Sequence, residues 1–402
     1  MLPVFLFIHK LEDNMIKTIK DIDLAGKKTL VRVDFNVPLK DGVIGDDTRI
    51  KEAVQTIKYA MEHGAKTALI SHLGRPKGEK KAEFSLKPVA DYINANFFPV
   101  KFIDDCIGEK VETALNELKN GEVILLENVR YYKGEEKNDP EFVKELAKLF
   151  DVYINDAFGT CHRKHASVYG AAELIDKKGA GFLVEKEAAY FDKLIKNPEK
   201  PFAAIIGGAK VSDKIGVIKS LLSIADIILI GGAMAYSFLK YKGISVGTSL
   251  VEDEQMGVVA DVLAEADKKG VKILLPIDHI ISDKFDGSPK ECDSVAIPDG
   301  YMGLDIGNKT RKEYASSLEK CKTVLWNGPM GVFENPDYAK GTFFIAEKLA
   351  SLGVTVVVGG GDSVSAVKKS GVADKISHIS TGGGASLEYI EFGTLPGIDI
   401  LR

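Results

Sequence analysis

The chain has 402 residues, of which 45% are hydrophobic and 28% are charged, a composition typical of a globular protein long enough for two domains. Its formal net charge of −5 argues against general binding of nucleic acids or anionic membranes, so an anion site must be a local cluster of basic groups. The four cysteines form no C-x-x-C pair, which argues against a zinc site or a disulfide framework and indicates reduced, cytoplasmic thiols.

The first 14 residues form a short extension. Its apolar run Leu2–Ile8 is interrupted by Pro3, lacks a basic start and a cleavage site, and is too short to span a bilayer. Met15 is a plausible start. We therefore expect residues 1–14 to be dispensable and the protein to act in the cytoplasm without a membrane.

Between residues 15 and 180, short β-branched runs alternate with helical segments such as Asp47–His63. Strands are predicted at Thr29–Phe35, Thr67–Ser71, Val100–Ile103, Val123–Leu126 and Val152–Asn155. This alternation implies a parallel sheet with helices on both faces.

Basic side chains lie at or just after several of these strands. Ligands of open α/β sheets bind outside the carboxyl ends of the strands, so Arg75, Arg130 and Arg163 could converge on one anion site. A single arginine is usually a solvated surface charge, but the repeated placement of Arg, His and Asn at strand ends favours the site. Arg32 lies within a strand and is interpreted as a structural partner outside the site.

Residues 181–200 are predicted to form a helix that connects two bodies. Leu183, Phe191, Leu194 and Ile195 form one apolar stripe, and Asn197-Pro198 ends the helix. The charges suit the helix dipole, with acidic residues predicted in the first turn and basic residues in the last: Glu185, Glu187, Lys193 and Lys196.

Strands and helices alternate again from Pro201 onward. Six strands are predicted, at Phe202–Ile206, Ile227–Ile230, Lys272–Leu275, Thr323–Trp326, Val354–Val358 and Ser377–Ile379. Glycines follow most of them, which suggests an edge where backbone approaches a ligand. Asp278–Pro298 is predicted to be a hairpin that turns at Asp286-Gly287.

Two glycine-containing segments of this half carry charged side chains. Residues 207–214 are predicted to open a helix with Lys210 and Lys214 on one face, where they favour phosphate contact over a solvated lysine pair. The segment lacks the P-loop pattern, and no G-x-G-x-x-G supports a dinucleotide dehydrogenase. Asp362 follows a glycine turn and suits either Mg²⁺ bound with phosphate oxygens or a helix N-cap. Thr381–Ser386 precedes a helix and offers bare amides to an anion.

Together these stretches resemble the phosphoglycerate kinase family from about Met15 to the C-terminus. The matching motifs are Arg32–Leu39, His72–Pro76, Gly207–Lys214, Trp326–Glu334 and Gly359–Ser363. The resemblance implies phosphoryl transfer between 1,3-bisphosphoglycerate and ADP, giving 3-phosphoglycerate and ATP, with Mg²⁺ as cofactor.

The resemblance also implies a role for individual residues. The glycerate substrate would be held by Asp34, Asn36, Arg49, His72, Leu73, Gly74, Arg75, Arg130 and Arg163. Catalysis would rest on Arg49, Lys210, Lys214, Gly382, Gly383 and Gly384, with Asp362 directing the metal. The nucleotide would contact Gly208, Ala209, Lys210, Lys214, Gly232, Gly303, Asn327, Val332, Glu334, Gly360, Gly361, Asp362 and Ser363.

The expected architecture is α/β, with two doubly wound parallel-sheet lobes joined by a helix and an active-site cleft between them. The expected parts are a glycerate domain over 15–180, the connecting helix over 181–200, a nucleotide domain over 201–386, and a segment over 387–402 that returns to the first lobe. We expect a monomer that acts on small molecules, with no nucleic-acid partner. The alternatives are another ATP-dependent carboxylate kinase and a non-catalytic two-lobed binder of anionic metabolites.

Overall fold

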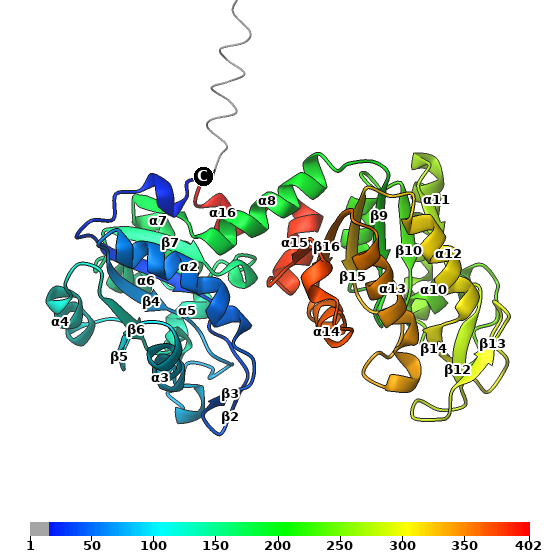
Figure 1. The fold of residues 1–402 in the computed structure, drawn as a ribbon, viewed down its shortest axis with the longest axis horizontal. Helices are drawn as coiled ribbons and strands as arrows, with labels where there is room; N and C mark the ends of the chain where they lie inside the picture. Colours follow the sequence, from blue (N-terminus) through cyan, green and yellow to red (C-terminus); the bar gives the residue numbers. More distant parts are fainter. Residues whose placement is uncertain (1–15) are drawn as a thin grey trace, which may run out of the picture. The chain divides into compact units, whose positions relative to one another are not determined.

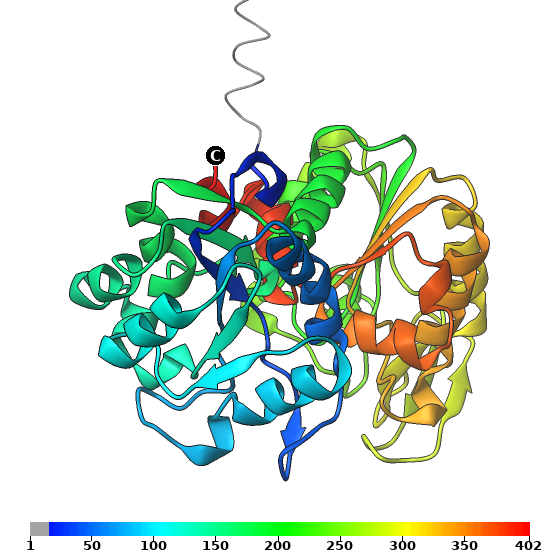
Figure 2. The same cartoon turned by 60° about the vertical axis from the view of Figure 1, so that its left-hand side comes forward.

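The computed structural model describes residues 16–402, which divide into two compact units (Figures 1 and 2). Unit 1 extends to Ala189 and includes Thr394–Arg402, whereas unit 2 comprises Tyr190–Gly393. The extension predicted to be dispensable, residues 1–14, lies outside the described residues.

Unit 1 is built on a six-stranded parallel sheet with the strand order β5-β6-β4-β1-β7-β8. The strands are β1 (Lys28–Val33), β4 (Lys66–Ile70), β5 (Lys101–Ile103), β6 (Val123–Leu126), β7 (Val152–Asp156) and β8 (Lys177–Ala180). Every residue of β6 and β7 is buried, including the polar Asn155 and Asp156 at the end of β7, as expected for strands covered on both faces. All five strands predicted here are present, with ends shifted by at most a few residues. Strand β8 was not predicted, because its sequence Lys-Lys-Gly-Ala contains no apolar run and it forms by pairing with β7.

The helices of unit 1, apart from α16 near the C-terminal end, lie in the connections between these strands, and a short hairpin follows β1. The helices are α2 (Thr48–Glu62), α3 (Lys87–Asn96), α4 (Glu109–Glu117), α5 (Lys133–Lys137), α6 (Pro140–Ala147), α7 (Ala171–Leu174) and α16 (Pro396–Asp399), and the hairpin pairs β2 (Leu39–Lys40) with β3 (Val43–Ile44). Helix α2 buries Ile50, Ala53, Ile57 and Ala60 at spacings of three and four, which fixes the face that packs on the core.

Helix α8 (Phe182–Lys196) contributes residues to both units. Leu183, Phe191 and Leu194 are buried, as the apolar stripe predicted. Glu187, however, is fully buried and lies beyond the first turn, so its predicted role there is wrong. The reason is its spacing: four residues separate it from Leu183 and from Phe191, which places it in the buried stripe.

Unit 2 contains a second six-stranded parallel sheet, with the order β11-β10-β9-β15-β16-β17. The strands are β9 (Phe202–Ile206), β10 (Ile227–Ile230), β11 (Lys272–Leu274), β15 (Thr323–Asn327), β16 (Thr355–Gly359) and β17 (His378–Ile379). From β9 the chain progresses in one direction to β11, and from β15 it progresses in the other to β17. Because parallel crossovers are right-handed, the two series of helices cover opposite faces and a topological switch point lies between β9 and β15.

The helices of unit 2 lie between or after these strands, and unit 2 also contains a small antiparallel sheet. The helices are α9 (Ile215–Leu221), α10 (Met234–Tyr241), α11 (Met256–Lys269), α12 (Asn308–Leu318), α13 (Lys340–Ser351), α14 (Gly361–Lys369) and α15 (Gly384–Phe392). The predicted hairpin is present as β12 (His279–Ser282) and β13 (Lys290–Cys292), but residues 283–289 connect the strands in place of a two-residue turn. Strand β14 (Met302–Ile306), which was not predicted, completes this sheet.

The last nine residues, Thr394–Arg402, belong to unit 1. The Gly397 N–H donates to the carbonyl oxygen of Cys161 at 2.8 Å, and Asn155 Nδ2 donates to the carbonyl oxygen of Gly397 at 3.2 Å. Helix α15, in contrast, packs on α9 within unit 2, and Ser220 Oγ donates to the carbonyl oxygen of Glu391 at 2.9 Å. The returning segment therefore begins at Thr394, after Gly393 ends α15, and not at Leu387.

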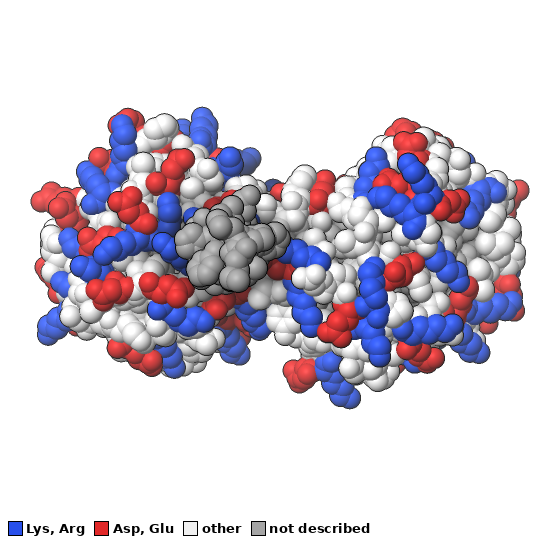
Figure 3. Space-filling view, turned by 90° about the horizontal axis from the view of Figure 1, so that it is seen from above, with Lys and Arg blue, Asp and Glu red and all other residues white. Residues whose placement is uncertain are grey.

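The surface carries both signs of charge. Positive and negative side chains are interspersed over the face drawn in Figure 3, in keeping with the small net charge. Within residues 16–402, none of the helices has the length and apolar character needed to cross a bilayer.

Candidate functional site

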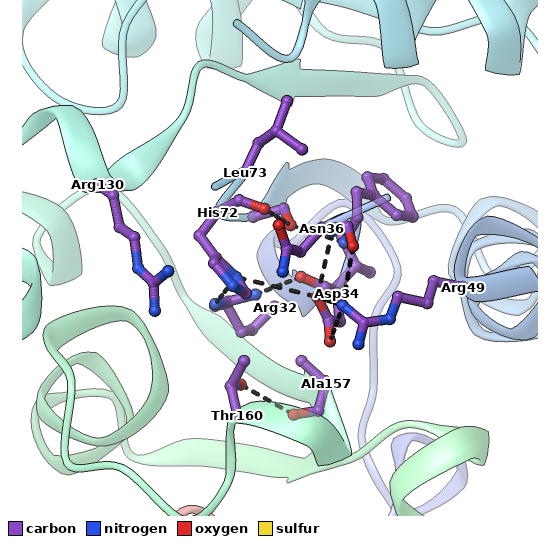
Figure 4. A network of polar contacts seen from close by, with 12 residues as sticks. Arg32, Asp34, Asn36, Arg49, His72, Leu73, Arg130, Ala157 and Thr160 are labelled. Carbon is purple, nitrogen blue, oxygen red and sulfur yellow. Dashed lines mark hydrogen bonds and ion pairs between the residues drawn. The ribbon is translucent and has the colours of Figure 1, made fainter. Parts of the chain in front are cut away.

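The carboxyl ends of β1 and β4 place several predicted substrate residues together in unit 1 (Figure 4). Arg49, on α2, points Nη1 to within 3.2 Å of a carboxylate oxygen of Asp34 and donates to the Asn36 carbonyl oxygen at 2.9 Å. Asp34 is buried and Arg49 is about one-third exposed. The ion pair therefore fixes the guanidinium of Arg49 at the edge of the network, where it can still contact a ligand.

His72 lies at the centre of this network. Arg32 Nη2 is 3.2 Å from His72 Nδ1, and Asp34 Oδ1 is 3.9 Å from the same atom. Burial, reinforced by nearby arginines, lowers the pKa of His72 well below its usual value. Since a guanidinium can only donate, Nδ1 must accept, and the proton of neutral His72 resides on Nε2. His72 thus presents an N–H donor suited to an anionic oxygen.

The backbone at Leu73 and Gly74 is held by two asparagines. The Gly74 N–H donates to Asn36 Oδ1 at 2.9 Å, and Asn128 Nδ2 donates to the Leu73 carbonyl oxygen at 2.7 Å. Gly74 has φ +61°, and a Cβ there would lie 2.4 Å from the Phe84 ring. Only glycine adopts this positive φ readily and also leaves room for the Phe84 ring. The sequence analysis missed Asn128. Its position just after strand β6 was the available signal, because His72 likewise lies just after strand β4.

The remaining arginines differ in burial. Arg130 is 6% exposed and donates from Nη1 to the Gly74 carbonyl oxygen at 2.8 Å. Arg163 is exposed and donates from Nε to His162 Nε2 at 2.9 Å. Arg75 is exposed, and no hydrogen bond or ion pair of its side chain is recorded within the described chain. Two of the three arginines, Arg75 and Arg163, are thus exposed, whereas Arg130 is buried.

Arg32 pairs structurally, as the sequence analysis interpreted it, and its partners include His72 of this network. It is 1% exposed and donates from Nε to Ser167 Oγ at 2.9 Å, and Ser167 Oγ in turn donates to the buried carboxylate of Glu135 at 2.6 Å. These contacts hold the guanidinium of Arg32, whose Nη2 donates to His72 Nδ1 and so fixes the tautomer of His72. The sequence does contain a signal for this buried network: Arg32 is a charged side chain inside the otherwise apolar end of a strand.

Burial also keeps two neighbouring histidines neutral. The pKa of His165 falls to about 4 through burial and the charges of Arg130, Arg32 and Arg163. The pKa of His162 falls to about 4 through burial and the charge of Arg163. These two histidines therefore add no positive charge to the region at neutral pH.

Unit 2 contains a cavity of about 450 Å³, a size typical of small-molecule sites. Seven of the predicted nucleotide residues line it: Gly208, Ala209, Gly232, Gly303, Val332, Glu334 and Asp362. Apolar lining residues that the sequence analysis missed include Leu250 and Phe285, which are 55% and 56% exposed. Exposed apolar side chains at a cavity with glycine walls suit the flat face of a nucleobase.

The glycines after β9, β10 and β15 approach one another as well as the cavity. A Cβ on Gly207 would lie 2.1 Å from the Pro329 carbonyl oxygen, and a Cβ on Gly232 would lie 2.5 Å from the Gly208 carbonyl oxygen. The Gly232 N–H donates to the Met330 carbonyl oxygen at 3.0 Å. These glycines were predicted to approach a ligand. They are also required because the three loops contact one another too closely for a Cβ.

The segment 207–214 is a loop, so the prediction that Lys210 and Lys214 share a helix face is wrong. Gly208 has φ +117°, and α9 begins only at Ile215. Lys214 Nζ instead donates to Asn327 Oδ1, and Asn327 Nδ2 donates to the Gly359 carbonyl oxygen at 2.8 Å. The pKa of Lys214 is lowered by burial, with Asp213 and Asp362 acting in the opposite direction. Asn327 does not line the cavity but positions Lys214 beside it.

Gly360, Gly361, Asp362 and Ser363 form the start of α14. Gly360 is the N-cap, and the exposed Asp362 makes no recorded hydrogen bond or ion pair within residues 16–402, so its N-cap role is wrong. Buried Ser363 accepts from the Gly328 N–H at 2.5 Å through Oγ. Ser363 thus joins the loops, and Asp362 is left as an unpaired carboxylate at the cavity.

Gly382, Gly383 and Gly384 form the turn before α15. Ser380 Oγ accepts from the Gly382 N–H at 3.1 Å, and Gly383 has φ +55°. Nothing lies within 4 Å of a Cβ built on Gly383 or Gly384, so bare backbone faces open space there.

The donor set fits a magnesium ion shared with substrate phosphates. Mg²⁺ is commonly held by one or two carboxylates together with phosphate oxygens and water. Asp362 supplies one free carboxylate at the cavity, and residues 16–402 contain no group of three or more candidate metal-ligating side chains.

Comparison with known proteins shows the family of the chain. The model of the family described as "Phosphoglycerate kinase" matches residues 19–392. A phosphoglycerate kinase of Borrelia hermsii is 52% identical over 390 residues, covering 96% of this chain and 99% of that protein. One of Clostridium botulinum is also 52% identical over 390 residues, covering 96% and 98%.

Solved structures give the same result. A phosphoglycerate kinase structure from Coxiella burnetii has a TM-score of 0.89 at 37% identity and covers 96% of this chain and 99% of its own. One from Pyrococcus horikoshii has a TM-score of 0.80 at 32% identity, covering 96% and 98%. The chain therefore belongs to the phosphoglycerate kinase family, kinases whose phosphate acceptor is a carboxylate.

Proposed function

We propose that the residues described above divide the reaction between 1,3-bisphosphoglycerate and ADP so that unit 1 binds the glycerate and unit 2 binds the nucleotide. The observation that carries this proposal is the separation of two kinds of site. Permanently charged arginines gather around His72 in unit 1, whereas unit 2 has a glycine-walled cavity beside Lys214 and Asp362.

In unit 1, Arg75, Arg130 and Arg163 supply cations for the phosphate and carboxylate of the glycerate. Asp34, Asn36 and His72 orient it through hydrogen bonds, and the backbone of Leu73 and Gly74 limits the space available. Arg49, held by Asp34 and Asn36, contacts the phosphoryl group during transfer.

In unit 2, the cavity takes the nucleoside and the loops at its edge take the phosphates. Gly208, Ala209, Gly232, Gly303, Val332 and Glu334 line the nucleoside site. Lys210, Lys214 and the amides of Gly382, Gly383 and Gly384 stabilise charge on the transferred group. Asn327, Gly360, Gly361 and Ser363 hold the loops in place.

The acceptor carboxylate of 3-phosphoglycerate is already ionised at neutral pH, so the reaction needs no general base. The protein must position two anions and neutralise the charge that develops between them. Mg²⁺, directed by Asp362, would neutralise charge on the nucleotide phosphates. We further propose that the protein acts as a cytoplasmic monomer on these small molecules.

A coupled assay tests the function. Purified protein should form ATP from ADP and 1,3-bisphosphoglycerate, with a requirement for Mg²⁺. A panel of carboxylate acceptors assayed with ATP should show that 3-phosphoglycerate is strongly preferred. Equal use of acetate or another simple carboxylate would contradict the assigned substrate, and the absence of any transfer would contradict the function.

A further inference from the structure

We propose that Glu252 is a positioning residue for the loop 207–214 and that it sets the affinity of unit 2 for the phosphates of the nucleotide. This inference rests on the proposed function, in which Lys210 and Lys214 of that loop hold those phosphates.

The loop needs support from outside its own segment. It begins at a glycine pair, contains Gly208 at φ +117°, and ends before α9 starts at Ile215. Within residues 209–214, the backbone bond recorded is from the Lys214 N–H to the Val211 carbonyl oxygen, at 2.9 Å. A loop of this kind loses conformational entropy when it orders around a ligand, and that loss weakens binding.

Glu252 provides such support at the middle of the loop. The Ser212 N–H donates to Glu252 Oε2 at 3.0 Å, and Ser212 Oγ donates to Glu252 Oε1 at 2.6 Å. Ser212 lies midway between Lys210 and Lys214, so both carboxylate oxygens hold the residue that separates the two cations. Hydrogen bonds to an ionised acceptor are roughly twice as strong as neutral ones.

Glu252 is ionised at neutral pH. Burial opposes ionisation, but the hydrogen bonds from Ser212 and the charge of Lys210 hold the pKa of Glu252 below its usual value. The carboxylate therefore also attracts Lys210, one of the two cations of the loop.

The segment that carries Glu252 is itself fixed to the nucleoside cavity. The Glu252 N–H donates to Oγ of buried Ser237 on α10 at 3.2 Å. Three residues earlier, Ser249 Oγ accepts from the Gly303 N–H at 2.9 Å, and Leu250 lines the cavity. One short segment therefore links the wall of the cavity to the phosphate loop and sets the distance between them.

The inference predicts an effect on the phosphates alone. Glu252 does not line the cavity, so its loss should spare the nucleoside and weaken the contacts of the loop. Isothermal titration of the full chain with adenosine and with ADP separates the nucleoside contacts from the phosphate contacts. Glu252→Gln should lose about tenfold in ADP affinity, equivalent to about 1.4 kcal/mol, and change adenosine affinity less than about twofold.

Two further variants complete the test. Ser212→Ala keeps the N–H but removes the hydroxyl, so it should lose about threefold in ADP affinity and leave adenosine binding unchanged. Glu254→Gln makes the same charge change two residues away, at an exposed side chain without a recorded partner in the described chain, and should match wild type. Thermal melting checks that each variant is folded, and Ser212→Ala decides the test if Glu252→Gln does not fold.

Equal loss of adenosine and ADP affinity, or no loss in either variant, would overturn the inference. Lys214→Met distinguishes this failure from failure of the proposed function. If Lys214→Met weakens ADP binding while the Glu252 and Ser212 variants do not, only the role of Glu252 is wrong. If Lys214→Met also leaves ADP binding unchanged, the loop does not hold the phosphates and both proposals fail.

Discussion

Arg49 owes its place to two acceptors, the Asp34 carboxylate and the Asn36 carbonyl oxygen, both of which it contacts through Nη1. Arg49→Met keeps much of the length of the side chain and removes the charge. If Arg49 acts mainly in the transition state, kcat should fall hundreds-fold or more, which corresponds to about 3–5 kcal/mol. Steady-state kinetics with a separate measurement of ADP affinity tests this, and ADP affinity should not change.

Lys58→Met is the matched control for Arg49, because Lys58 is an exposed cation on the same helix. It should behave as wild type. A rise in the KM for the glycerate with unchanged kcat in Arg49→Met would show that Arg49 only binds substrate.

Asp362 is the unpaired carboxylate at the nucleotide cavity. Asp362→Asn preserves its size and removes the charge that a hard cation requires. The Mg²⁺ concentration needed for half-maximal rate at fixed ADP should rise at least about tenfold, while glycerate binding stays constant. Asp374→Asn, at an exposed aspartate shortly after α14, is the control, and an unchanged Mg²⁺ dependence in Asp362→Asn would remove Asp362 from metal binding.

Asp305 gives a pH-dependent prediction for unit 2. Its buried carboxylate accepts from the N–H groups of Gly341 at 2.6 Å and Ile306 at 2.9 Å, and burial raises its pKa to about 7. The folded state retains the proton in a range where the unfolded state, with a pKa near 4, has released it. The stability of unit 2 that depends on this proton is therefore present below about pH 4 and is lost as the pH rises to about 7.

Asp305→Asn does not titrate, so the stability difference between wild type and this variant should shift against wild type between pH 4 and 7 and stay level above that. Trp326, the single tryptophan, is buried in β15 and reports the unfolding of unit 2 by its fluorescence in urea. A difference that is constant across this range would show that Asp305 has an ordinary pKa.

At the scale of elements, apolar runs predicted the sheets well. Strands β6, β9 and β10 have the predicted bounds because each is an uninterrupted apolar segment between polar turns. Edge strand β8 and strand β14 were missed, because pairing with neighbouring strands, and not local sequence, makes them strands.

The candidate site residues were predicted through motifs, and local spacing left out their partners. The spacing of four placed the Lys210–Lys214 pair on a helix that is absent there, and Arg32 was expected to have a structural partner that the sequence did not name. The partners are far along the chain: Glu252 lies 40 residues from Ser212, and Ser167 lies 135 residues from Arg32. Local periodicity contains no information about such partners.

The contact of α16 with unit 1 is close enough to test by one added methyl group. A Cβ on Gly397 would lie 2.9 Å from Cys161 Cα and 2.9 Å from Val168 Cγ1. Gly397→Ala should therefore destabilise unit 1 by about 1–3 kcal/mol through overpacking. Because Cys161 directly precedes His162 and Arg163, the variant should also weaken 3-phosphoglycerate binding.

Gly45→Ala is the control for this prediction, since a Cβ there meets only ordinary contacts, at 3.7 Å and 3.8 Å. Urea unfolding followed by far-ultraviolet circular dichroism, with calorimetric titration of 3-phosphoglycerate, measures both effects. Unchanged stability and affinity in Gly397→Ala would mean that the C-terminal segment moves away at little cost.

At the scale of the whole molecule, the two units differ in how they use the chain. Unit 2 is one continuous stretch, Tyr190–Gly393, with the core of its parallel sheet complete within it. Unit 1 is discontinuous, because nine residues from the far end of the chain lie against Asn155 and Cys161.

Because unit 1 is discontinuous, the unit that is synthesised first is not the unit whose chain is complete first. A ribosome adds residues from the N-terminus at about 5–20 per second, and domains generally fold as they emerge. The first 189 residues leave the ribosome long before Thr394–Arg402, so the turn at Cys161 next to Arg163 stays uncovered while all of unit 2 is made. Unit 2 can reach its final fold first, and unit 1, although made first, is completed only by the last residues of the chain.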